Sequence, residues 1–267
     1  MIKILQEAAY KGGEVLRSYF KKKYKTSLKT SHQNIVTEAD IKSQKIIKKY
    51  LEEEIPKKLV ITKEEIGFIG EEKLVKKGKV TFIIDPLDGT SNFATGFEYF
   101  SIIIGVMIDN MLTHGLIYSP MQDLMYYAEK GKGTFRKDDS GIKQIRIKKT
   151  DLKNIYFSGG FSVYDDLRKL QMDMYHKLFP HFRSYLSLNA GGSSIGEFLD
   201  GVFGVYFMGG PKIWDIAGAK ILVEEAGGVM VNWYGKPFEL DLEDYEKTYP
   251  MFVCHPGNLA EILEFMK

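Results

Sequence analysis

The pattern of apolar and polar residues predicts two helices at the start of the chain. Apolar residues and glycine recur every three to four positions between Leu5 and Tyr19, as they do on one face of an amphipathic helix. Thr37-Glu38-Ala39-Asp40 resembles a capping box, with Asp in place of the usual Glu, and predicts a second helix that continues to Pro56. Residues 22–35 show little periodicity, so we expect a loop between the helices.

Runs of β-branched and apolar residues predict strands through the rest of the first half. Residues 59–62 form a short predicted strand that leads into Lys63-Glu64-Glu65, and residues 80–84 form a buried strand. Further runs divided by turn residues are typical of antiparallel strands and cover residues 101–108, 111–118, 124–128 and 133–136. We interpret the polar residues 137–141 as a hairpin tip.

Strands alternate with helices beyond about Thr150. Strands are predicted around residues 155–157, 202–207, 228–231 and 251–254, and helices near 165–178, 193–199, 215–226 and 258–265. Such alternation favours an α/β arrangement. We therefore predict two domains: an α+β domain with an antiparallel sheet over residues 1–150, and an α/β domain over residues 151–267.

The composition supports a packed core and gives no reason to expect a polyanionic partner. Hydrophobic residues make up 44% of the 267 residues, enough to fill such a core. The formal charge of +2 is nearly balanced, so we expect neither nucleic acid nor a membrane surface as partner. The single cysteine, Cys254, lies in an apolar run and cannot form an internal disulfide. With no stretch typical of a signal peptide or membrane span, we expect a cytoplasmic protein.

The hexapeptide Asp85-Pro86-Leu87-Asp88-Gly89-Thr90 follows the predicted strand of residues 80–84 and carries the clearest chemical signal. Two carboxylates three residues apart leave a strand end on one turn, with a hydroxyl group just beyond them. Hard divalent cations need such oxygen ligands, and a pair of these ions can clamp a phosphoryl group. The alternative is a turn that only reverses the chain, since Asp, Gly and Pro are ordinary turn residues.

Two other acidic positions also lie at the ends of predicted elements. Glu64 and Glu65 follow a predicted strand, and Asp215 precedes a predicted helix. Carboxylates at element ends can converge on one site. Taken singly, Glu64 has the alternative reading of a surface charge, and Asp215 that of a helix N-cap.

Glycine-rich segments could supply the other half of a phosphate site. Gly89-Thr90-Ser91-Asn92 and the run from Asn189 through Ala190 and Gly191 to Ser194 could offer backbone N–H groups to an anion, although each could also be a plain loop. Cations together with N–H donors suit a phosphate monoester. The five histidines show no HExxH spacing, and neither a Walker loop nor a GxSxG elbow is present, which disfavours zinc, P-loop and acyl-transfer chemistry.

Together, three segments resemble the inositol monophosphatase family of magnesium-dependent, lithium-sensitive phosphatases, to which fructose-1,6-bisphosphatase is related. They are Asp85 to Phe93, Trp214-Asp215-Ile216-Ala217-Gly218-Ala219 and Glu224-Glu225-Ala226-Gly227-Gly228. The resemblance covers essentially the whole chain. It implies a two-domain α/β/α/β/α layered sandwich, which agrees with the predicted elements.

The resemblance also implies roles for individual residues. Asp85, Asp88, Asp215 and the backbone carbonyl of Leu87 would ligate two or three Mg²⁺ ions per subunit. Thr90 would orient the attacking water, and Asp40 would support a third metal and that water. Relatives are usually homodimers, so we expect a homodimer here.

Two pairs, Glu64-Glu65 and Glu71-Glu72, both look like the Glu-Glu pair of the family. The Ile-Gly that precedes Glu71 is the more familiar context. Glu64 directly follows the predicted strand of residues 59–62, and residues 63–70 are similar to archaeal members. We therefore predict Glu64 as the ligand, with Glu65 beside it.

Two departures from the family pattern bear on the substrate. Asn189-Ala190-Gly191 stands where members usually have Gly-Ser/Thr-Ala, and Met208 falls where animal inositol phosphatases carry a glutamate that holds inositol hydroxyls. The substrate-binding residues that we predict are Asp88, Gly89, Thr90, Ser91, Asn189, Ala190, Gly191 and Asp215. We expect hydrolysis of inositol-1-phosphate, fructose-1,6-bisphosphate or both. The alternatives are a 3′-phosphoadenosine 5′-phosphate phosphatase and a catalytically silent binding protein.

Overall fold

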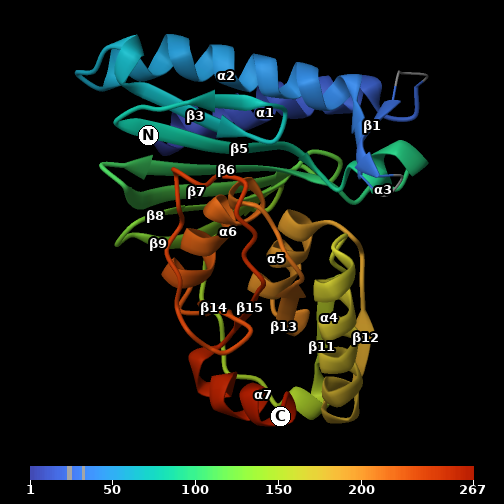
Figure 1. The fold of residues 1–267 in the computed structure, drawn as a ribbon. Helices are drawn as coiled ribbons and strands as arrows, with labels where there is room; N and C mark the ends of the chain where they lie inside the picture. The colour runs from blue at the N-terminus through green and yellow to red at the C-terminus, as the bar shows by residue number, and fades with distance from the viewer. Residues whose placement is uncertain (23–25, 32–33) are drawn as a thin grey trace.

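The protein stacks helices and two large β-sheets in alternating layers. The computed structural model describes residues 1–22, 26–31 and 34–267. Helices α1 and α2 cover one face of the first sheet, α5 and α6 lie between the two sheets, and α4 and α7 cover the outer face of the second sheet (Figure 1). This order gives the α/β/α/β/α sandwich, so the predicted fold class is confirmed.

The first sheet has eight strands in the order β10-β9-β8-β7-β6-β5-β3-β4. Their bounds are β3 Ile66–Gly70, β4 Leu74–Lys76, β5 Val80–Asp88, β6 Ser101–Ile108, β7 Met111–Ser119, β8 Leu124–Glu129, β9 Gly133–Asp138 and β10 Gly141–Ile145. Neighbours pair antiparallel except β3 and β5, which run parallel. Helices α1 (Ile2–Tyr19) and α2 (Glu38–Lys58) cover one face, and the short helix α3 (Thr90–Thr95) follows β5.

The second sheet has five strands in the order β12-β11-β13-β15-β14. Their bounds are β11 Tyr156–Gly160, β12 Ser184–Leu186, β13 Phe203–Met208, β14 Val229–Asn232 and β15 Met251–Cys254. The helices that flank this sheet are α4 Asp165–Leu178, α5 Gly191–Leu199, α6 Ile213–Glu225 and α7 Leu259–Phe265. Single turns of 3₁₀ helix cover Lys63–Glu65, Leu152–Asn154, Phe179–His181 and Pro256–Asn258.

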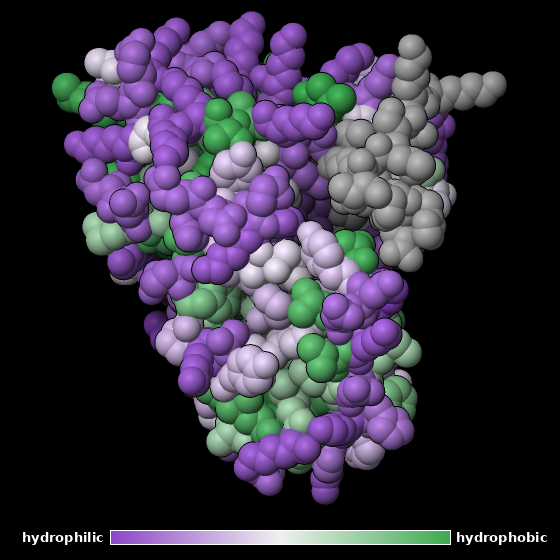
Figure 2. Space-filling model, viewed as in Figure 1, coloured by the Kyte–Doolittle hydropathy of each residue, from purple (hydrophilic) through white to green (hydrophobic). Residues whose placement is uncertain are grey.

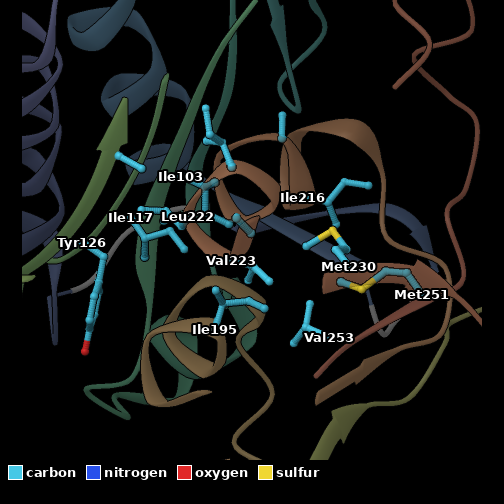
Figure 3. Close-up of a cluster of buried hydrophobic side chains, with 14 of the residues drawn as sticks. Ile103, Ile117, Tyr126, Ile195, Ile216, Leu222, Val223, Met230, Met251 and Val253 are labelled. Atoms are coloured by element: carbon cyan, nitrogen blue, oxygen red, sulfur yellow. The ribbon is translucent and has the colours of Figure 1, made fainter. Parts of the chain in front are cut away.

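Helix α6 is the centre of the structure because it packs against both sheets. Ile216, Leu222 and Val223 of α6 meet Ile103 of the first sheet and Val253 of the second in one apolar cluster (Figure 3). A helix that packs between two sheets is apolar over most of its surface, which explains the apolar residues that predominate in α6. Glycine allows the close approach: a Cβ at Gly115 would lie 2.3 Å from the carbonyl oxygen of Gly218.

Most predicted elements are present within one to three residues of the expected bounds. Helices α1, α2, α4, α5, α6 and α7 and strands β6 to β9 agree with the sequence pattern, and Cys254 is buried in the core. Helix α2 begins with the predicted capping box, in which the Thr37 N–H donates to Asp40 Oδ2 at 2.9 Å. It continues two residues beyond Pro56 because that proline lies in its last turn.

Two expectations about the first half are corrected. Residues 59–62 form no strand, and the strand of this region is β3, which follows the turn Lys63–Glu65. The expected loop at residues 22–35 contains a hairpin of β1 (Thr26–Ser31) and β2 (Asn34–Thr37), while residues 23–25 and 32–33 lie outside the described part. Strands β4, β10 and β12 were not predicted. Strands β4 and β12 have three residues each, which carry too little pattern, and four of the five residues of β10 are exposed.

On the face that Figure 2 shows, the upper part is mostly polar and the lower part is more apolar. Figure 2 shows hydrophilic residues across most of the upper part of this face, and hydrophobic residues gathered in the lower half, which holds the five-stranded sheet. Within the described residues, no helix has the length and apolar character needed to cross a membrane. The predicted boundary near Thr150 falls in the segment that joins β10 to β11, and the division into two domains remains a prediction.

Candidate active site

One cavity of about 810 Å³ collects acidic side chains from distant parts of the chain. It lies where β5 ends and where α5 and α6 begin, so three element ends face the same space. The predicted site residues that line it are Asp85, Leu87, Asp88, Gly89, Thr90, Asn189, Ala190, Gly191 and Asp215. Ser91 does not line it. Glu71 and Glu72 do, although we had predicted neither as a ligand.

The motif from Asp85 to Asp88 forms the end of β5, where the pairing with β6 shifts register. The Leu87 N–H donates to Asp85 Oδ1 at 2.9 Å, which fixes one oxygen of that carboxylate. Ser43 Oγ on α2 donates to the Pro86 carbonyl at 3.1 Å. These bonds hold the turn between the sheet and α2, so the carboxylates occupy defined positions.

Asp85 is buried among other carboxylates, which disfavours its charged form. Burial first, and then the charges of Glu71, Asp88 and Asp215, raise the pKa of Asp85 well above its ordinary value. Buried like charges without a partner are costly. A cation among these side chains would relieve that cost.

Asp88 is held by the first turn of α5. The N–H groups of Gly191 and Gly192 donate to its two oxygens at 2.8 Å each, and Ser101 Oγ donates at 3.0 Å. Burial raises the pKa of Asp88, and these hydrogen bonds oppose that rise. The amides that we expected to cradle a phosphate therefore bind a carboxylate of the protein instead.

Asp40 lies at the start of α2 beneath Thr90. Its Oδ2 accepts from Thr37 Oγ1 at 2.5 Å, and Thr90 Oγ1 lies 3.2 Å from its Oδ1 and 3.0 Å from the Leu87 carbonyl oxygen. Asp40 has no exposed surface, and this burial raises its pKa to about 7. The nearby charges of Glu71 and Glu72 contribute to this rise in pKa, whereas the hydrogen bonds from Thr37 oppose it.

Asp40, Glu71 and Glu72 bring carboxylate oxygens within 4.8 Å of one another. The Glu71 N–H donates to the Ile84 carbonyl at 3.3 Å, so Glu71 begins beside the end of β5. Hard cations such as Mg²⁺ take carboxylate and carbonyl oxygens as ligands. The donor set of the cavity, carboxylates together with the Leu87 carbonyl, fits such an ion.

Asp215 acts both as a capping residue of α6 and as a carboxylate of the cavity, the two alternatives that the sequence left open. It is the third residue of α6, and the Lys212 N–H donates to its Oδ2 at 2.6 Å, which completes a capping interaction. The same residue lines the cavity opposite the β5 turn and raises the pKa of Asp85. The cap therefore fixes where this carboxylate lies in the cavity.

The prediction of Glu64 and Glu65 as ligands is corrected by their position. Both precede β3, whereas Asp85 lies near the C-terminal end of β5, and the two strands run parallel. The five residues of β3 therefore separate them from the cavity by about 17 Å. Glu65 Oε2 instead accepts from the Thr62 N–H at 2.8 Å, and the Glu64 side chain is exposed to solvent. Glu71, at the other end of β3, occupies the expected place.

Strand β3 begins at Ile66, seven residues after the start of the predicted strand of residues 59–62. Carboxyl ends of parallel strands meet at one edge of a sheet, so the acid after β3 and the acid after β5 had to be neighbours. The apolar run Ile66–Gly70 directly before Glu71 was the signal that could have identified it. Lys212, Tyr164 and Glu246 also line the cavity, and no sequence motif marked them.

Comparisons with known proteins agree with this geometry. A model of the inositol monophosphatase family matches residues 1–262. Inositol monophosphatase 1 of Sus scrofa is 30% identical over 234 residues, which cover 87% of this chain and 83% of that protein. The human inositol monophosphatase 1 is 31% identical over 235 residues, with the same shares covered.

A solved structure of an IMPase from Thermotoga maritima superposes with a TM-score of 0.83 at 24% identity. The superposition covers 99% of this chain and 95% of that one. The likeness in fold therefore extends through both sheets. From the match over nearly its whole length, the chain belongs to the inositol monophosphatase family, a family of phosphomonoesterases.

Proposed function

We propose that this protein is a Mg²⁺-dependent phosphomonoesterase that hydrolyses a small sugar or polyol phosphate. The observation that carries the proposal is the convergence of Glu71, Asp85, Asp88 and Asp215 on one cavity. These carboxylates come from three separate segments of the chain, since Asp85 and Asp88 both lie on β5, and their mutual repulsion does not stabilise the fold. A divalent cation bound between these carboxylates would offset their repulsion.

The residues that would hold Mg²⁺ are Glu71, Asp85, the Leu87 carbonyl, Asp88 and Asp215, with Asp40 and Glu72 beside them. Two or three ions per subunit are proposed. When bound, Mg²⁺ supplies the Lewis acidity that binds the phosphoryl group, activates water and stabilises the leaving oxygen.

Thr90 and Asp40 would position the nucleophilic water. A hydroxyl group has one proton and two acceptor lone pairs. When Thr90 Oγ1 donates its proton to Asp40 Oδ1, at 3.2 Å, it can accept a hydrogen bond from the water. The water oxygen would then be oriented towards phosphorus. Besides its proposed place among the metal ligands, Asp88 would hold the two sides of the cavity together through its hydrogen bonds to α5.

Other residues of the cavity would contact the sugar or polyol. Lys212 Nζ lies 3.2 Å from Glu246 Oε2 and 5.9 Å from the centre of the Tyr164 ring. A cation, a carboxylate and an aromatic ring can bind hydroxyl groups, a second phosphate and the apolar face of a sugar. Met208 accepts hydrogen bonds only weakly. These features support a substrate with anionic or hydroxyl groups beyond the scissile phosphate, such as inositol-1-phosphate or fructose-1,6-bisphosphate.

The experiment is a release assay for inorganic phosphate over a panel of esters. Inositol-1-phosphate, fructose-1,6-bisphosphate and 3′-phosphoadenosine 5′-phosphate are compared with Mg²⁺, with EDTA and with added Li⁺. We expect turnover of a sugar or polyol ester that requires Mg²⁺. Preference for the nucleotide would favour the 3′-phosphatase, and no turnover of any ester would favour a silent binding protein.

Asp85→Asn is the matched site variant, and Asp109→Asn is its control. Asp109 is exposed in the β6–β7 turn and makes the same chemical change without touching the cavity. We expect Asp85→Asn to fold and lose hydrolysis, while the control keeps full activity. Full activity in folded Asp85→Asn protein would overturn the proposal.

A further inference from the structure

A second cavity, of about 490 Å³, lies apart from the candidate active site and shares no lining residue with it. It forms between the segment that leaves β10 and the end of α5 with the start of β13. Its lining includes Lys143, Arg146 and Lys148. Cavities that hold small organic ligands commonly measure about 300–1,000 Å³, so the size suits such a ligand.

The three cations have no acidic partner in the described part of the chain. Lys143, Arg146 and Lys148 are exposed, and no carboxylate oxygen of the described residues lies within 4.0 Å of their charged nitrogens. Asp200 is the acidic residue of the lining, and it is already engaged. Its Oδ2 accepts from the Tyr126 hydroxyl at 2.8 Å and lies 3.1 Å from Arg136 Nε.

The carbonyl groups at the end of α5 are also satisfied. Those of Gly196, Glu197 and Phe198 accept from the N–H groups of residues 200, 202 and 201, respectively. The negative end of the helix is therefore capped by the chain itself, and it does not need these cations as partners. Among the described residues, Lys143, Arg146 and Lys148 are thus left without a paired carboxylate.

The floor of the cavity is apolar, and one further donor lies at its edge. Phe198 and Phe203 are each 2% exposed and line the cavity together with Ile145. His255 Nδ1 accepts from the Gly257 N–H at 2.9 Å, so the neutral ring carries its proton on Nε2 and can donate there. Cations at the rim over an apolar floor match a molecule with an anionic group and an apolar body.

We propose that this second cavity binds a small phosphorylated metabolite. Its phosphate would lie against Lys143, Arg146 and Lys148, and its apolar part against Phe198 and Phe203. The inference does not depend on the proposed hydrolysis, because it concerns different residues and requires no metal.

The probe is 1-naphthyl phosphate, a fluorescent dianion with an apolar ring, titrated into the full-length protein in EDTA. Without metal, the carboxylates of the candidate active site disfavour an anion there. The charge variants described next separate binding in the second cavity from any binding at Lys212. We expect saturable binding with a dissociation constant of about 1 mM or tighter. The neutral 1-naphthol and inorganic phosphate should each bind more weakly.

The variant Lys143→Gln/Arg146→Gln/Lys148→Gln should bind the probe about tenfold more weakly, because it loses three charge interactions. Lys3→Gln/Lys45→Gln/Lys236→Gln is the control, which removes the same charge from exposed sites outside the cavity. All six positions are exposed, so both proteins should fold. Equal affinity in the two variants, or no saturable binding to the unaltered protein, would overturn the proposal.

Discussion

Replacing Asp40 by Asn should stabilise the metal-free protein at neutral pH. Asp40 is fully buried, and burial raises its pKa from 3.8 to about 7. Ionising it therefore costs the folded state free energy. Asn keeps an oxygen that can accept from the Thr37 N–H, so the cap of α2 survives while the buried charge is removed.

The size and the sign follow from the two pKa values. The folded protein keeps this proton up to about pH 7, whereas the unfolded chain releases it near pH 3.8, so stability falls as pH rises between these values. A difference of about 3.2 pKa units corresponds to about 4 kcal/mol at 1.36 kcal/mol per unit. About 2 kcal/mol of this stability is lost as the pH rises from 5.5 to 7. Above about pH 7, the contribution of Asp40 to the free energy of unfolding no longer changes with pH.

Urea unfolding of metal-free protein at pH 5.5 and 7.5 measures this contribution. Between pH 5.5 and pH 7.5, we expect the free energy of unfolding of the parent protein to fall by about 2 kcal/mol more than that of Asp40→Asn. The control Asp109→Asn should follow the parent, because Asp109 is exposed. If Asp40→Asn and the parent show the same pH dependence, burial of an ionised Asp40 is not the cost that we assign to it.

Three further predictions concern the ligands and the water. Glu71→Gln should abolish phosphate release, whereas Glu64→Gln should leave kcat/KM unchanged, because Glu71 lines the cavity and Glu64 does not. An equal loss of activity in the two variants would restore Glu64 as a candidate ligand. Thr90→Val should lower kcat by about 100-fold with little change in KM, since it removes the hydroxyl that orients the water; unchanged kcat would exclude this role. Adding Mg²⁺ at 100 times its dissociation constant should stabilise the parent by about 2.7 kcal/mol in thermal unfolding, and Asp85→Asn much less; an equal shift in both would place the ion elsewhere.

The turn that we propose as a metal site could be predicted because its signal is local. β-Branched residues mark the strand that carries Asp85, and Gly89 marks the end of that strand just after Asp88, although β5 continues through Pro86. Asp215 could be predicted for the same reason, since helix starts have a sequence pattern. The structure shows that its capping bond and its place in the cavity are compatible.

Strand β3 could not be predicted with the same certainty because it contains two glycines, which usually weaken a strand. Here glycine is required: a Cβ at Gly67 would lie 2.6 Å from the backbone nitrogen of Gly78. That requirement comes from a tertiary contact, and it concealed the strand that positions Glu71. The bond between Asp88 and Gly191 joins residues 103 positions apart, and no local pattern specifies such a partner.

The most direct test of the account is the position of a bound cation. Crystals grown with Mn²⁺ in place of Mg²⁺, measured at the manganese absorption edge, locate the ions by anomalous scattering. We predict peaks within coordinating distance of Glu71, Asp85, Asp88 and Asp215, at about 2.0–2.3 Å from their oxygens. Fully occupied peaks at Glu64, or none in the cavity at saturating Mn²⁺, would contradict the claim that these carboxylates form a metal centre.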